Sequence, residues 1–252
     1  MGVIQGTQSV MLSRVANSIY WMNRYIERAE NYSRFIDVNL NLTLDLSEGT
    51  AEQWEPLVLI TGDQEVFKAR RTDATMSHGE GWHFGRLGRL IERADKTSRI
   101  LDVKYFFLLP SVADVGTSLD NIQWAALLKS ASALQMYRKR YGRISPKEVA
   151  EFLILDSEFP RAIHYCLIKA EESLHAISGS EIGRFENLAE KRLGRLRPEL
   201  AYANIEEIMA GGLHEFLDSF QTKLNCVGDG IAETFFTFRQ VEDMVSRERS
   251  DS

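Results

Sequence analysis

Cysteine and proline are both scarce in this sequence. Its two cysteines, Cys166 and Cys226, lie far apart and form no Cys-x-x-Cys pattern. The sequence therefore offers no disulfide framework and no cysteine zinc site, which fits a reducing compartment. Only 5 prolines interrupt 252 residues. Because proline breaks the interior of a helix, their rarity leaves room for long helices.

Long apolar runs and an excess of positive charge are also missing. No segment approaches the roughly 18 consecutive apolar residues of a membrane helix, and residues 1–10 lack the basic region and apolar run of a signal peptide. We therefore expect no membrane contact and a cytoplasmic location. The formal net charge of -6 argues against a nucleic-acid partner, because such binding rests on basic surface.

The spacing of apolar residues predicts an all-α fold, a multi-helix bundle with one long helix duplicated. Apolar positions recur every three or four residues, whereas the alternation of strands is scarce. We expect the two long copies over about residues 12–45 and 82–109, separated by a short helix near 51–60 and a polar loop over 61–81. Residues 1–240 would form a single helical domain, followed by a polar tail over 241–252.

Further helices are expected across about residues 119–238. Ser145-Pro146 is a typical helix start, with serine as N-cap and proline at the first helical position. Gly211-Gly212 is expected to kink the last helix. The ranges we expect are 119–141, 146–156, 160–177, 183–203 and 204–238.

An internal repeat is the strongest pattern in the sequence. Residues 24–38, RYIERAENYSRFIDV, align with residues 89–103, RLIERADKTSRILDV, at an offset of 65 positions. Both copies keep an Arg-x-x-Glu-Arg-Ala core and a later Ser-Arg pair, and Glu30 matches Asp95 in charge. Duplication of one helix is the simplest account of this similarity.

The repeated charges share one face of each predicted helix. In the first copy this face carries Arg24, Glu27, Arg28 and Asn31, at helical spacing. The opposite face is apolar and is expected to point toward the core, with Ile19, Met22, Ile26, Ala29, Ser33, Ile36 and Leu40 on it. If the two helices pack antiparallel, Glu27 would meet Arg93 and Glu92 would meet Arg28, in the bidentate geometry that arginine favours.

Two interpretations of this charged set are open. It forms a structural ion network that was copied along with the helix, or it lines a polar pocket for a carboxylate, a phosphate or a partner group. In the second case the arginines would hold the anion and one glutamate would act as general base. We favour the first, because structural ion networks also concentrate charge in this way. The candidate residues are Arg24, Glu27, Arg28, Arg89, Glu92 and Arg93.

A metal site is a further alternative. Glu80-x-x-His83 and Glu172-x-x-His175 have the spacing of di-iron helical bundles, which would make the protein a ferritin-like metal binder. Glu80 is expected to lie before its helix, however, where that spacing loses its meaning. We therefore expect no metal site and no cofactor.

The same residues carry a resemblance to a known family. MLSRVANSIYWMNRYIERAENYSRFIDV from Met11, GWHFGRLGRLIERADKTSRILDV from Gly81 and VAEFLILDSEFPRAIHYCL from Val149 resemble stretches of the alpha-E domain family, bacterial helical proteins named for a Glu-Arg motif. The third stretch adds Asp156 and Arg161 to the candidate site. Family members tend to carry a further helical segment after the first Glu-Arg helix, where this chain has only a short piece around Trp54.

The resemblance implies a context and not a reaction. Alpha-E proteins typically accompany, or are fused to, an ATP-grasp protein similar to amide-forming ligases. The function expected is therefore a non-catalytic helical partner or scaffold for such a ligase in peptide synthesis or modification, with a peptide or carboxylate as a possible ligand. An enzyme with an anion site at the Glu-Arg motifs is the alternative from a different class.

Overall fold

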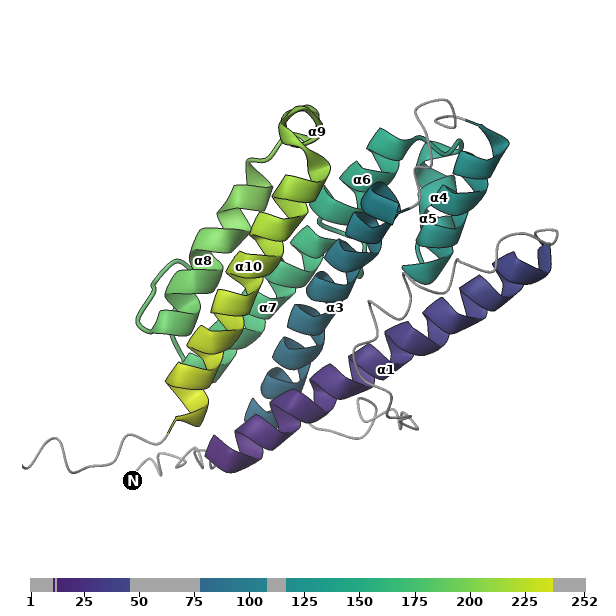
Figure 1. Ribbon diagram of the computed structural model, residues 1–252. Helices are drawn as coiled ribbons and strands as arrows, with labels where there is room; N and C mark the ends of the chain where they lie inside the picture. The colour runs from purple at the N-terminus through teal and green to yellow at the C-terminus, as the bar shows by residue number, and fades with distance from the viewer. Residues whose placement is uncertain (1–10, 12, 46–77, 108–116, 238–252) are drawn as a thin grey trace, which may run out of the picture.

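A computed structural model of the chain describes residues 11, 13–45, 78–107 and 117–237. Within these ranges it contains nine α-helices and no strand, which confirms the all-α, multi-helix prediction (Figure 1). The short helix expected at 51–60, most of the polar loop at 61–81 and the tail at 241–252 lie outside the described residues. The expected limits of a single domain, 1–240, stay a prediction.

The two copies of the repeat form the long helices α1 (Ser13–Asp45) and α3 (Glu80–Phe107), close to the predicted ranges. α3 begins earlier than expected, because Glu80 belongs to its first turn and not to the preceding loop. An acidic side chain in that turn complements the positive end of the helix dipole. The Glu80 carboxylate also accepts a hydrogen bond from the backbone N–H of Met11 at 3.0 Å.

Seven shorter α-helices follow. Asn187 and Asn204 cap two of them, since each side chain accepts a hydrogen bond from a backbone N–H in the first turn. The bounds are α4 (Ser118–Ser130), α5 (Leu134–Tyr141), α6 (Pro146–Leu155), α7 (Ile163–Ser178), α8 (Leu188–Ala201), α9 (Ile205–Gly211) and α10 (Leu213–Ile231), with a π-helical turn η4 (Ala232–Phe236) at the end.

Two of the predicted helices are in fact interrupted. The range 119–141 is broken between α4 and α5, where Ser132 has a left-handed φ of 50°. Apolar spacing could not reveal this break, because Ala131 and Ala133 on either side of it are both buried. Gly212, with φ of 99°, fully separates α9 from α10 where only a kink was expected.

Two other helices begin later than predicted. α7 begins at Ile163 and not at Pro160, because the Asp156 side chain accepts backbone hydrogen bonds from Glu158 and Phe159 and holds a turn there. α8 begins at Leu188 and not at residue 183, because Asn187 caps the helix directly before Leu188. The start at Ser145-Pro146 is confirmed, although the Ser145 side chain makes no capping hydrogen bond.

α3 is the central helix of the bundle. It packs against α1 on one side and against α7 and α10 on the other, while α8 packs on α7 and α10 (Figure 1). One continuous core of buried apolar side chains joins these helices, from Tyr20 in α1 to Ile231 in α10. Searched over the described ranges, no helix has the length and apolar character needed to cross a membrane.

α1 and α3 run in the same direction, and their backbones lie close together at Gly88. A Cβ atom added there would lie 2.5 Å from the backbone oxygen of Tyr20, so only glycine permits this contact. From Figure 1, α1 then diverges from α3 toward its C-terminal end, where α4 lies beside it. An antiparallel arrangement, the condition under which the sequence paired the two motifs, is therefore not the one present. Contacts pair Met11 with Glu80 and Arg28 with Glu92, so residue numbers rise together along both helices.

Candidate functional site

The charged face of α1 points into the bundle. Asn23, Glu27 and Asn31 are buried, whereas Met22 and Ile36 of the opposite face are 41% and 51% exposed. The prediction that the apolar face of this helix meets the core is therefore wrong. The helical period identifies two faces, but a charged face can be buried when the neighbouring helix brings opposite charges.

Glu92 of α3 receives two arginines from α1. Its side chain is fully buried, and its carboxylate accepts hydrogen bonds from Arg24 Nε at 2.8 Å and from Arg28 Nε at 2.6 Å. Arg28 Nη2 makes a further bond at 3.1 Å, which completes a bidentate fork. Lys96, one helical turn further along α3, lies 3.6 Å from the same carboxylate.

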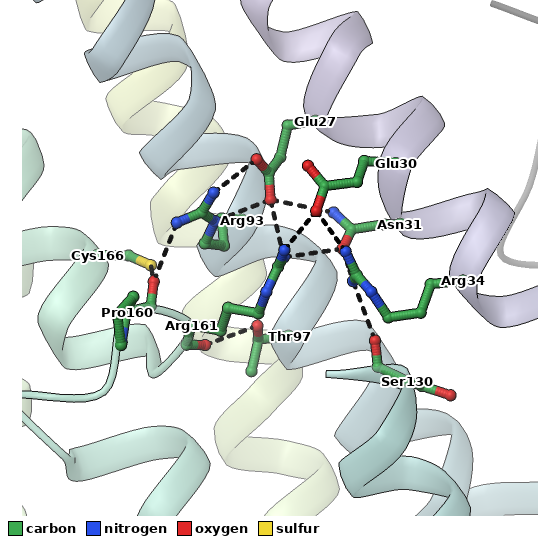
Figure 2. A network of polar contacts seen from close by, with 10 residues as sticks. All are labelled: Glu27, Glu30, Asn31, Arg34, Arg93, Thr97, Ser130, Pro160, Arg161 and Cys166. Carbon is green, nitrogen blue, oxygen red and sulfur yellow. Dashed lines mark hydrogen bonds and ion pairs between the residues drawn. The ribbon is translucent and has the colours of Figure 1, made fainter. Parts of the chain in front are cut away.

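Glu27 of α1 is held by arginines from two other elements. Arg93 of α3 donates to both carboxylate oxygens, at 2.8 and 2.9 Å, and Arg161 from the turn before α7 donates at 3.1 Å (Figure 2). Burial opposes ionisation of this carboxyl, but the hydrogen bonds and charges of Arg93 and Arg161 outweigh it and hold the pKa of Glu27 below its usual range. Glu27 is therefore an ionised, donor-saturated carboxylate, which makes it a poor general base.

These contacts are reciprocal between the two repeats. Arg93 of the second copy binds Glu27 of the first, and Arg28 of the first binds Glu92 of the second. Both pairings expected from the sequence are thus present, although the helices are parallel. Exchanging the two copies maps one of these two pairings onto the other.

The network extends beyond the core motif through a second repeated pair. Arg34 donates to Glu30 at 2.6 Å, one turn apart on α1, and Arg99 donates to Asp95 at 3.0 Å in the equivalent position of α3. Arg161 also bonds Glu30, at 2.6 Å, so the turn before α7 is tied to α1 at two carboxylates (Figure 2). Sequence reasoning recorded these pairs as part of the repeat but did not include them in the site.

Arg34 and Thr97 connect this network to neighbouring backbone. Arg34 Nη1 donates to the carbonyl of Ser130 at the end of α4, at 3.1 Å, and Thr97 of α3 donates to the carbonyl of Arg161 at 2.9 Å (Figure 2). The ion network therefore links α1, α3, α4 and the α6–α7 turn.

Asp156 lies apart from the other candidates. Its carboxylate accepts the backbone N–H groups of Glu158 and Phe159, at 2.8 and 2.6 Å, and pairs with Arg140 of α5. It shapes the α6–α7 turn that places Arg161 against Glu27. Its role in the site is therefore indirect, through the position of that arginine.

Arg89 and its repeat equivalent Arg24 have different surroundings and different roles. Arg24 binds Glu92, whereas Arg89 lines a cavity of about 160 Å³ between α3 and α7. Burial and the positive charge of Arg93 lower the pKa of Arg89, and the charges of Glu27 and Glu30 partly offset them. We call this space the α3–α7 cavity; its walls are Trp82, Arg86, Arg89, Leu90, Arg93 and Tyr165. Trp82, Arg86 and Tyr165 were not predicted from the sequence.

Three of the four side chains in the two Glu-x-x-His spacings have other partners. Glu80 binds the N–H of Met11, Glu172 pairs with Lys169 at 2.6 Å, and Nδ1 of His175 lies 2.7 Å from the Ser180 hydroxyl. In the part of the chain that the structure describes, no three His, Cys, Asp or Glu side chains group in a way that could hold a metal ion.

A family model described as a predicted α-helical domain with a conserved ER motif matches residues 11–74 and 69–236. Uncharacterised proteins of Mycobacterium tuberculosis and Mycobacterium bovis are 27% identical to this chain over 168 residues, which cover 64% of this chain. The matched region spans only 18% of those relatives' own length. No solved structure matches. Two reciprocal Glu-Arg pairs at the centre of a helical bundle, with a family match over most of the chain, show that this protein belongs to the Alpha-E family.

Proposed function

We propose that this chain is a non-catalytic helical partner of an ATP-grasp amide ligase in a peptide-synthesising or peptide-modifying system. The resemblance that its Glu-Arg helices carry implies this partner class. The curated relatives are consistent with it, because in them the matched region is a small part of a much longer chain. The reaction would belong to the ligase, and this chain would bind it or present its acceptor peptide.

One observation carries the proposal, the apolar outer face of α1. Among the described residues of this helix, five large apolar side chains are between 38% and 51% exposed: Val15, Trp21, Met22, Tyr25 and Ile36. We call them the α1 flank. Their helical spacing places them on one side of α1, and exposed apolar side chains gathered on one side typically mark an interaction site. Because the charged face of α1 is turned inward, the flank is left on the outside.

The composition of the α1 flank suits a protein partner. Trp21 and Tyr25 lie one turn apart with ring centroids 5.9 Å apart, and Arg24 and Arg28 lie over these rings at 5.0 and 5.5 Å. Tryptophan, tyrosine and arginine are the residues most enriched at binding hot spots. Glu92 binds Arg24 and Arg28 and so fixes the guanidinium groups that lie over the two rings. The rings are therefore held in place before a partner binds.

An enzyme centred on the Glu-Arg motifs receives less support from the same geometry. Both motif carboxylates are already saturated by arginines, and a general base needs a carboxylate that can reach a substrate proton. The reciprocal pairs instead join α1 to α3 and to the α6–α7 turn, as expected of a structural ion network.

The proposal is tested by co-elution of the full chain with an ATP-grasp amide ligase from the same organism, at micromolar concentration, with and without ATP. We expect one complex peak. Tyr25→Ala in the α1 flank should weaken the complex at least ~10-fold, the effect of losing about 1.4 kcal/mol at a hot spot. Tyr202→Ala is the matched control, because Tyr202 is also exposed but lies at the end of α8.

Two outcomes would count against the proposal in different ways. Separate elution under all conditions would remove the ligase as partner. Equal affinity of the wild type, Tyr25→Ala and Tyr202→Ala would keep the ligase but exclude the α1 flank as its contact surface.

A further inference from the structure

The α3–α7 cavity lies beside the ion network but is distinct from it. Three of its arginines, Arg86, Arg89 and Arg93, occupy positions i, i+3 and i+7 of α3, which places them on one stripe of that helix. Trp82 continues the stripe one turn earlier, and Tyr165 faces it from α7. The cavity is therefore lined by three guanidinium groups of α3 and by the aromatic rings of Trp82 and Tyr165.

Among the described residues, three arginines and no carboxylate line this cavity. Glu27 and Glu30 are shared among the three arginines that bind them, Arg34, Arg93 and Arg161. On the other side, the single carboxylate of Glu172 is shared by Lys169 at 2.6 Å and Arg86 at a long 3.5 Å. Of the cations in these two groups, Arg86 and Arg93 line the cavity.

This arginine lining has a preferred ligand chemistry. A wall of three guanidinium groups matches a dianion better than a carboxylate, and a phosphate monoester carries close to two negative charges near neutral pH. Arginine forks bind phosphate oxygens bidentately. Arg89 adds a further guanidinium to the wall, and its lowered pKa reflects burial and the crowding of positive charge by Arg93.

The size and the remaining walls narrow the ligand further. A cavity of about 160 Å³ accommodates roughly five water molecules at about 30 Å³ each, which is room for a phosphate group and a few attached atoms. Trp82, Leu90 and Tyr165 supply apolar surface beside the arginines. The guanidinium of Arg86 already lies 5.2 Å from the Trp82 ring, so cation and ring form one surface.

We propose that the α3–α7 cavity is a binding site for the phosphate group of a small phosphate monoester, held by Arg86 and Arg89 between Trp82 and Tyr165. Arg93 lies at the back of the site, where its bidentate bond to Glu27 fixes the guanidinium. The site is independent of the proposed ligase partner, because it lies on α3 and α7 and not on the α1 flank.

Isothermal titration of the full chain tests the site with three probes at constant ionic strength: inorganic phosphate, phenyl phosphate and acetate. We expect saturable binding of phosphate with one site per chain, tighter binding of phenyl phosphate because of the aromatic walls, and binding of acetate at least ~10-fold weaker. Arg86→Gln and Arg89→Gln should each raise the Kd for phosphate about 10-fold or more, the effect of losing a charged hydrogen bond.

Matched controls make the result specific. Arg184→Gln removes an arginine that is 71% exposed and only 3.8 Å from its partner Glu181, and it should leave the Kd unchanged. Trp82→Leu should abolish the preference for phenyl phosphate over phosphate while leaving the phosphate Kd within about two-fold of the wild type. Circular dichroism of each variant verifies that it is folded.

Three results would overturn the proposal. They are the absence of saturable phosphate binding to the folded wild type, equal losses of affinity in Arg184→Gln and Arg86→Gln, and acetate binding as tightly as phosphate.

Discussion

Replacing Glu92 with glutamine should destabilise the protein more than almost any other single charge removal. The Glu92 side chain is fully buried, and three cations surround its carboxylate: Arg24, Arg28 and Lys96. Glutamine has nearly the same shape and keeps one oxygen acceptor, but it cannot balance these charges. The substitution therefore isolates the electrostatic role of the residue.

The expected loss follows from the burial of each partner. Removing one member of a buried ion pair typically costs about 3–5 kcal/mol, because the remaining charge stays buried without compensation. Arg24 and Arg28 are 14% and 23% exposed, so water can reach part of each guanidinium, and we place the loss near the lower end, at about 3 kcal/mol. For a chain of this length that corresponds to a fall in Tm of roughly 10 °C.

Urea unfolding followed by circular dichroism measures this loss. The midpoint should fall with an unchanged slope, since the same surface is exposed on unfolding. Glu181→Gln is the matched control, because Glu181 is 83% exposed and 3.8 Å from Arg184; it should change the free energy of unfolding by less than about 0.5 kcal/mol. If Glu92→Gln were as mild as this control, the ion network would not hold α1 on α3 and the reasoning would fail.

Three further predictions follow from the α1–α3 contact and its surroundings. Gly88→Ala should lower the free energy of unfolding by about 1–3 kcal/mol in urea titrations, because the added Cβ meets the Tyr20 backbone, whereas Gly211→Ala, with open space around it, should be neutral or slightly stabilising. Burial raises the pKa of the Cys166 thiol to about 12. Ellman's reagent should therefore titrate only the exposed Cys226 in the native chain and both thiols in denaturant. Rapid reaction of two thiols in the native chain would contradict the burial of Cys166. Since the folded pKa of Glu27 lies below its unfolded value, its stabilisation is present above about pH 4.5 and is lost as the pH falls through the folded pKa. The difference in stability between wild type and Glu27→Gln should therefore shrink below that pH in urea titrations, and a difference that stayed constant down to pH 3 would contradict the pairing.

Helix positions could be predicted where a local chemical signal marks them. Ser145-Pro146 begins a helix because proline already has the required φ and lacks only an N–H that the first turn does not use. The break at Ser132 carried no such signal. The apolar residues on either side of it keep a helical spacing, and their side chains are buried in the core. The turn at Asp156 depends on its carboxylate bonding backbone two and three residues later, which shifted the start of α7 by a few residues.

The candidate site divides in the same way. Glu27, Arg28, Glu92 and Arg93 could be identified from the repeated order, and their pairing between the copies was considered for an antiparallel packing but is present between parallel helices. The role of Arg161 came only from resemblance, since its contact with Glu27 joins residues 134 positions apart. No local pattern could place it there.

The sequence by itself therefore determined the helices, the duplication and the identity of the Glu-Arg partners, because helical periodicity and repeated order are local properties of the chain. The tertiary structure decided that the two copies run parallel, that the charged face of α1 is buried and its apolar face exposed, and that Arg86, Arg89 and Tyr165 line one cavity. The physical reason is that burial of a face depends on what packs against it. α3 and Arg161 bring opposite charges to Glu27, and α1 brings them to Glu92. The charged face of α1 therefore forms the contact with α3.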